Sequence, residues 1–85
     1  MPSTLHTNEH KILVDLLIEA RKEAQLNQTQ VGERFGRDQK FVSLVEKSQR
    51  RLDVLEFYSY CKAMNHDPVK LFEALADKLS GTKPK

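Results

Sequence analysis

Basic side chains gather in one short stretch of a chain that is otherwise close to neutral. Residues 34–51 contain six basic residues against two acidic ones, although the formal net charge of all 85 residues is only +2. The six are Arg34, Arg37, Lys40, Lys47, Arg50 and Arg51, and the two acids are Asp38 and Glu46. Such a cluster of cations can bind phosphate groups. It can equally form an ordinary solvated face, so the charge pattern alone leaves both interpretations open.

Other side-chain chemistry is sparse. His6 and His10 are four residues apart with Glu9 nearby, but a metal site needs three or four ligands and no other cluster supplies them. We therefore interpret this segment as a solvated face and expect no metal. His66 lies in a polar turn. Because the sequence contains no phosphate loop, nucleophile elbow or carboxylate pair, we expect neither an enzyme nor a cofactor.

Length and composition indicate one small domain. A chain this short buries a modest share of its surface, so a partner subunit is a natural way to bury more. The single cysteine, Cys61, excludes an internal disulfide and permits a cytoplasmic location. Its neighbours on the fourth helix, Val54, Phe57 and Met64, predict that it is a small core residue. The longest apolar runs are far shorter than the roughly 20 residues of a membrane span, and the N-terminus lacks a signal-peptide pattern. We predict a cytoplasmic protein without a membrane segment.

Apolar spacing and capping residues predict five helices. In the first, about 9–25, apolar residues recur at intervals of three and four. We expect the others at about 28–35, 39–47, 54–64 and 68–80. The expected N-caps of the first four are Asn8, Asn27, Asp38 and Asp53, and Gln30 completes a capping box with Asn27. The predicted organisation is a flexible segment 1–8, a domain 9–80 and a flexible tail 81–85. The predicted fold class is all-α, a compact five-helix bundle.

The second and third helices meet the local requirements of a helix-turn-helix. Two short helices that cross steeply need a small residue where they meet and a turn residue that tolerates positive φ. Gly32 is the small residue and Gly36 the turn residue. Glycine inside a helix costs roughly 1 kcal/mol relative to alanine, and close helix packing explains why it stands there. Apolar side chains fill the angle between the helices: Val31, Phe35, Val42 and Val45.

The same residues resemble a known family. The stretch 18–36 (IEARKEAQLNQTQVGERFG) is similar to the first two helices of the phage-repressor family, also described as Cro-like or xenobiotic-response-element (XRE) helix-turn-helix proteins. Residues 41–46 (FVSLVE) resemble the end of its recognition helix, and residues 50–54 (RRLDV) the entry to its fourth helix. The resemblance covers about residues 13–75. It implies a repressor-like five-helix DNA-binding domain that acts on double-stranded DNA.

The resemblance implies roles for individual residues. Gln28 matches a glutamine that touches a DNA phosphate. Gln39, Lys40, Ser43 and Leu44 match positions of the recognition helix, about 39–47, that face base edges or the flanking backbone in the major groove. Glutamine can pair with adenine, and lysine can donate to guanine. Arg21 and Glu46 match an ion pair that ties the first helix to the third, and we expect that pair to be structural.

Two positions depart from the family pattern. Phe41 stands where a small polar residue is usual, and Leu44 stands where a polar residue is frequent. In the groove both can meet thymine methyl groups. The alternative for Phe41 is that its ring folds back onto the protein or lies in a protein contact. These departures change the base preferences that the family resemblance implies.

The loop after the recognition helix lies along the DNA backbone in this family. The resemblance therefore assigns Ser48, Arg50 and Arg51 to phosphate contacts, which position a protein without reading sequence. One of the two arginines can instead pair with a nearby acid. Arg37, in the turn before the helix, is a further phosphate candidate. Ser48 also replaces a frequent glycine, which affects the shape of the loop.

The helices carry more apolar surface than one small core requires. Val14 and Ile18 lie off the main stripe of the first helix, and the last two helices add Leu55, Tyr58, Phe72 and Leu79. These residues either cover one another within the monomer or form a symmetric dimer surface, and we favour a homodimer through the C-terminal helices.

We therefore predict a sequence-specific transcription regulator. We expect it to be a repressor, because repression is the commoner activity in the family that it resembles. It binds a pseudo-palindromic operator as a dimer and needs no small-molecule ligand. The alternative is a protein-interaction module on the same fold, such as an antitoxin that masks a partner.

Overall fold

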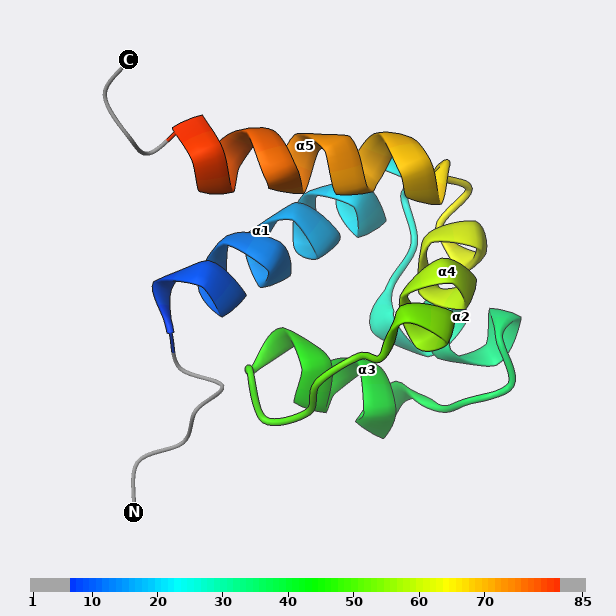
Figure 1. Ribbon diagram of the computed structural model, residues 1–85. Coiled ribbons are helices and arrows are strands. Elements are labelled where there is room, and N and C mark those ends of the chain that lie inside the picture. Colours follow the sequence, from blue (N-terminus) through cyan, green and yellow to red (C-terminus); the bar gives the residue numbers. More distant parts are fainter. Residues whose placement is uncertain (1–6, 82–85) are drawn as a thin grey trace.

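A computed structural model describes residues 7–81, which form five helices and no strand in that range (Figure 1). The helices are α1 (Asn8–Glu23), α2 (Gln28–Arg34), α3 (Gln39–Glu46), α4 (Val54–Ala63) and α5 (Pro68–Gly81). The predicted all-α class is confirmed. Most of the two terminal segments that we expected to be flexible, 1–8 and 81–85, lies outside the described residues. Within them, Asn8 is the first residue of α1 and Gly81 is the last residue of α5.

Side-chain caps set where the helices begin. Asn27 and Gln30 form the expected capping box at α2, and the Asp38 side chain accepts a hydrogen bond from the Phe41 backbone N–H at α3. Asp53 caps α4, as the sequence predicts, and it too forms a capping box. The cap expected at Asn8 is wrong. Thr7 caps α1, because its extended backbone lets its hydroxyl accept from the His10 N–H at 3.0 Å, and Asn8 is already helical.

Each helix from α1 to α4 is followed by one residue in the left-handed region of φ. These residues are Gln25 (φ 61°), Gly36 (φ 78°), Ser48 (φ 60°) and Asn65 (φ 60°). This conformation reverses the chain direction after a helix, and glycine adopts it at least cost. Gly36 therefore has the role that its type predicted. Ser48 adopts the same conformation without being a glycine.

The helices enclose a single core. In Figure 1, α5 and α1 lie side by side, α3 lies at the opposite edge from α5, and α2 and α4 complete the bundle. The largest fully buried side chains come from the first four helices: Leu17 of α1, Val31 of α2, Val42 and Val45 of α3, and Tyr60, Cys61 and the C-cap residue Met64 of α4. Val42 and Val45 were predicted to face inward, and both are at most 1% exposed.

Two expectations about apolar residues are wrong. Val14 lies off the main apolar stripe of α1 but is buried, because the buried face of this helix is wider than the stripe that the sequence predicts. Val54 was grouped with Cys61 on the buried face of α4, yet it is 81% exposed. It directly follows the cap Asp53, so it stands at the rim of the bundle where the helix begins.

Candidate nucleic-acid interface

The turn between α2 and α3 depends on close backbone contact at Gly32. A Cβ atom added at Gly32 would lie 2.4 Å from the carbonyl oxygen of Asp38 and 2.5 Å from its carbonyl carbon. The Arg37 N–H also donates to the Gly32 carbonyl oxygen at 2.8 Å. No side chain fits between these backbones. The small residue that the sequence places here is therefore what allows α3 to start directly against α2.

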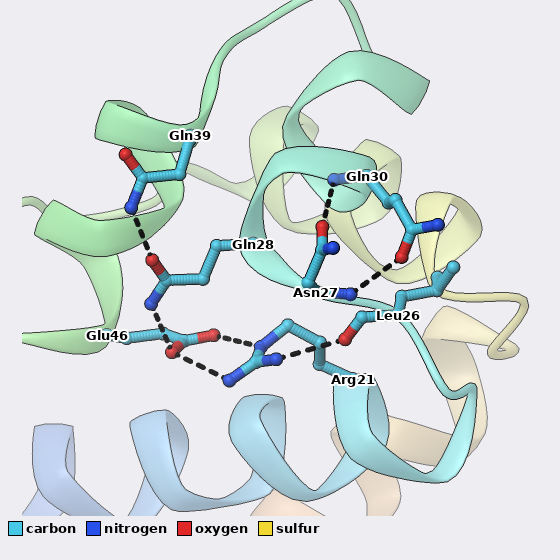
Figure 2. A network of polar contacts seen from close by, with 7 residues as sticks. All are labelled: Arg21, Leu26, Asn27, Gln28, Gln30, Gln39 and Glu46. Carbon is cyan, nitrogen blue, oxygen red and sulfur yellow. Dashed lines mark hydrogen bonds and ion pairs between the residues drawn. The ribbon is translucent and has the colours of Figure 1, made fainter.

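A network of polar side chains joins α1 and α2 to both ends of α3 (Figure 2). Arg21 donates to both carboxylate oxygens of Glu46, from Nε at 2.7 Å and from Nη2 at 3.2 Å. Its Nη1 donates to the carbonyl oxygen of Leu26 at 3.0 Å. The pair is largely buried, with side chains 15% and 8% exposed. Arg21 and Glu46, which the family resemblance named as a pair, thus tie the end of α1 to the end of α3.

Two glutamines extend this network to the solvent. Gln28 Nε2 donates to Glu46 Oε1 at 2.9 Å, and Gln39 Nε2 donates to Gln28 Oε1 at 2.6 Å. Both ends of the Gln28 amide are therefore engaged within the protein, and the exposed Gln39 lies at the end of the chain of bonds (Figure 2). Gln28 and Gln39, the first residues of α2 and α3, are thus both linked to the buried ion pair of Arg21 and Glu46.

The residues expected to read bases lie at two depths on α3. Gln39 and Lys40 are exposed at the start of the helix, and Ser43 and Leu44 are half-buried one turn further on. Residues four apart share one face of a helix, so each of the first pair stands above one of the second. These four side chains form an outward face that offers an amide, an ammonium group, a hydroxyl and an apolar group.

Phe41 is buried rather than exposed on that face. Its side chain belongs to the core and is 8% exposed, with its ring centroid 5.6 Å from that of Phe35 in an edge-to-face contact. Of the two alternatives that the sequence left open, the structure shows the ring folded back onto the protein. We therefore do not include Phe41 among the base-reading residues that we propose below.

Two basic residues expected to bind phosphate meet at one carboxylate. Arg37 Nη2 and Arg50 Nη2 lie 3.1 Å and 2.8 Å from Glu56 Oε2. Arg50 Nη1 also donates to the carbonyl oxygen of Arg51 at 2.6 Å. Both guanidinium groups stack on Phe41, at 4.3 Å and 4.8 Å from its ring centroid. The side chains of Arg37 and Arg50 nevertheless remain 43% and 38% exposed.

Glu56 is the residue of this site that sequence reasoning missed. Its capping-box role at α4 accounts for it locally, because its Oε1 accepts from the Asp53 N–H at 3.0 Å. That bond, together with the guanidinium groups of Arg50 and Arg37, holds the pKa of Glu56 below its ordinary value against the opposing effect of desolvation. Glu56 is thus a carboxylate with three partners. The available signal was an acid six residues after Arg50, near enough for the pairing considered in the sequence.

The other candidates have plain structural positions. Ser48 lies in the turn after α3, with its hydroxyl 3.3 Å from Nδ1 of His10, and Arg51 is exposed. Cys61 is fully buried, and burial raises the pKa of its thiol to about 12, which keeps it protonated. Among residues 7–81 no group of His, Cys, Asp and Glu side chains could hold a metal ion, and His6 lies outside that range. No helix in the same range is long and apolar enough to cross a membrane.

Five helices, of which the second and third form a helix-turn-helix with an exposed face on α3, define the class of helix-turn-helix proteins. No family model and no curated protein matched the sequence. A solved structure does match. It is described as an XRE-family like protein from Pseudomonas syringae pv. tomato str. DC3000, and it has 40% sequence identity and a TM-score of 0.80, over 95% of this chain and 94% of that chain. The chain belongs to this XRE-like family.

Proposed function

We propose that this protein is a sequence-specific, double-stranded DNA-binding transcription regulator of the cytoplasm, which represses as a homodimer on a pseudo-palindromic operator. The outward face of α3 supports this proposal most directly. It is exposed at Gln39 and Lys40, and a buried ion pair and a glycine contact fix the helix behind it. An α-helix of this kind fits the major groove, where amide and ammonium groups distinguish base pairs.

The proposed roles follow the depth and chemistry of each side chain. Gln39 and Lys40 reach base edges, and Ser43 and Leu44 contact the neighbouring base or its methyl group. Gln28, Arg37, Ser48, Arg50 and Arg51 flank α3 on both sides and contact phosphates. Gln28 can do so with the second N–H of its Nε2 group, because its bond to Glu46 uses only one of the two N–H groups and orients the amide. Phosphate contacts of this number make affinity strongly dependent on salt.

An electrophoretic mobility-shift assay with fragments of the source genome, repeated over a range of salt concentrations, tests this function. The proposal expects a few fragments to be retarded at concentrations where bulk DNA is not, with affinity that falls steeply as salt rises. A folded protein that retards no fragment at low salt would contradict it.

An apolar groove between α4 and α5 supports the homodimer. It has a volume of about 540 Å³ and is lined by apolar side chains, with Asp53 the one charged residue among those that line it. The exposed apolar residues at or near this groove are Val54, Leu55, Tyr58, Val69 and Phe72, which are 54–81% exposed. An exposed patch of this kind is typical of an interaction surface. A symmetric dimer would cover the same patch on two copies and set their recognition helices about one DNA turn apart.

We expect Val69→Glu to weaken self-association by about 100-fold or more, because it places a charge at the centre of a buried apolar contact. Val69 is 67% exposed in the monomer and follows Pro68 in the first turn of α5, where a carboxylate suits the helix dipole, so the fold should be retained. Analytical ultracentrifugation measures the change. Thr29→Glu is the matched control, since Thr29 is the exposed second residue of α2 and lies outside the groove. A monomeric wild-type protein at high concentration would contradict the dimer.

The same groove keeps one alternative function open, a protein-interaction module such as an antitoxin. Phe41 no longer supports that alternative, because its ring is buried. Co-purification separates the two possibilities. A second protein that binds stoichiometrically over α4 and α5 and leaves the wild-type chain unable to form dimers would favour the interaction module.

A further inference from the structure

Four side chains from separate elements meet beside the start of α3. Arg37 comes from the turn before α3, Phe41 from its first turn, Arg50 from the loop after it, and Glu56 from the first turn of α4. Both guanidinium groups stack on the Phe41 ring, and both donate hydrogen bonds to the Glu56 carboxylate. The turn before the recognition helix and the loop after it are thereby joined to one point on α4.

The geometry presents the arginines outward. The Glu56 side chain is 20% exposed, whereas those of Arg37 and Arg50 are 43% and 38% exposed, so the carboxylate is the more deeply placed partner. A guanidinium group has five N–H donors in a rigid fork, and the bonds to Glu56 engage the terminal nitrogens Nη2 of both side chains and Nη1 of Arg50. Two cations against one carboxylate leave a net positive charge at the exposed side.

We propose that Arg37 and Arg50 form one binding site for a single DNA phosphodiester, and that Glu56 and Phe41 are its positioning residues. This inference rests on the proposed DNA-binding function and adds to it two residues that contact no DNA themselves. Glu56 fixes the positions of the two guanidinium groups from their more buried side, and the Phe41 ring packs against their flat faces. The arginine side chains are therefore ordered before the phosphate arrives, so that phosphate binding costs less side-chain entropy.

The proposal predicts that Glu56→Gln changes the affinity for DNA in the direction opposite to that expected from simple electrostatics. Glu56→Gln removes a negative charge close to the interface, which by itself would strengthen attraction to DNA. If Glu56 positions the arginines, the same substitution weakens binding, because a neutral amide holds two guanidinium groups less firmly than a carboxylate does. Glutamine also serves at this position of a capping box, so α4 should still begin at Val54.

The first measurement compares E56Q with the charge-matched control E33Q on a short random-sequence duplex, by fluorescence anisotropy across a range of salt. Glu33 is exposed on α2 and lies outside the arginine site. We expect E56Q to bind about three- to tenfold more weakly than E33Q, with a salt slope smaller by about one. Thermal melting in the absence of DNA shows that each variant is folded. E56Q that is folded and binds as tightly as E33Q, or more tightly, would overturn the proposal.

Phe41→Leu tests the second positioning residue, because leucine retains apolar burial but offers no ring face to the guanidinium groups. We expect a folded F41L to lose affinity for the duplex by a similar factor and to lose little more when combined with E56Q. Fully additive losses in the double variant would contradict a single shared site.

The second measurement separates this inference from the proposed function. Inorganic phosphate is titrated into the protein at low salt, and the arginine Nε–Hε signals are followed by NMR. The proposal expects Arg37 and Arg50 to shift together in the wild type and to need several-fold more phosphate in E56Q. This result without any binding to DNA would leave the anion site standing and contradict the proposed function. Equal, weak shifts at all exposed arginines would overturn the site, even in a protein that binds DNA.

Discussion

Arg21→Met is expected to lower the free energy of unfolding by roughly 3–5 kcal/mol, because it leaves a largely buried carboxylate without its cation. The Glu46 side chain is 8% exposed and receives two of its hydrogen bonds from Arg21. In the variant the Gln28 amide is the remaining partner of Glu46 that the network shows. A small domain is stable by about 5–15 kcal/mol in total, so this one change would remove much of the margin. Urea denaturation followed by circular dichroism measures it.

Two controls show whether burial of the pair causes that loss. Lys11→Met breaks an ion pair with Asp15 whose side chains are 73% and 60% exposed, and it should cost less than about 1 kcal/mol. Combining Arg21→Met with Glu46→Met removes both charges, and the double variant should be more stable than Arg21→Met alone. If Arg21→Met costs no more than Lys11→Met, the pair does not hold α1 to α3 as we describe.

The second large effect is expected at Gly32. Gly32→Ala should destabilise the fold by roughly 3 kcal/mol, at the upper end of the usual cost of overpacking. The added Cβ would lie 2.4 Å from the Asp38 carbonyl oxygen, a backbone atom that a rotamer change cannot move. Alanine's better helix propensity, worth about 1 kcal/mol, offsets only part of this cost. The helices would have to separate, which would also displace the outward face of α3.

The other glycines supply the comparison for Gly32. At Gly36 an added Cβ meets nothing within 4 Å but φ is +78°, so Gly36→Ala should cost about 1–2 kcal/mol from backbone strain alone. Gly81 has neither constraint, and Gly81→Ala should be close to neutral. Thermal and urea denaturation of the three variants should give the order Gly32, Gly36, Gly81 from most to least damaging. A Gly32→Ala protein as stable as Gly36→Ala would contradict the close contact between α2 and α3.

The sequence was sufficient for features that depend on neighbouring residues. The caps at Asn27, Asp38 and Asp53 and the turn at Gly36 could be predicted, because each is set by side-chain chemistry within three or four residues. The helical period likewise placed Val42 and Val45 in the core. The cap at Thr7 was missed because Thr7 and Asn8 are both good capping residues, and residue type alone does not distinguish them.

The candidate site was harder to predict because its members come from separate elements. Phe41 could have faced DNA or protein, and the choice is set by Phe35 and by two guanidinium groups from either side of α3. Glu56 was missed because its capping role explains it without reference to Arg37 or Arg50. The exposure of Val54 depends on where α4 begins relative to the core, which periodicity does not specify. Long-range packing, rather than local propensity, determined each of these outcomes.

The apolar groove and the outward face of α3 belong to different elements. The groove is lined mainly by residues of α4 and α5, together with Leu13, Leu52 and Asp53, whereas Gln39, Lys40, Ser43 and Leu44 lie on α3. A homodimer through the groove would therefore leave both recognition helices available for DNA. The two surfaces can be disrupted separately, Val69→Glu in the groove and Gln39→Ala on α3, which makes assembly and base reading independently testable.

The central claim is that the outward face of α3 reads bases in double-stranded DNA. Selection of bound duplexes from a random-sequence pool, followed by sequencing, tests it most directly. We predict that the wild-type protein enriches a pseudo-palindrome with half-sites about 10–10.5 base pairs apart, and that Gln39→Ala relaxes the preference at one position in each half-site. A folded wild-type protein that enriches no sequence over the starting pool would contradict the claim.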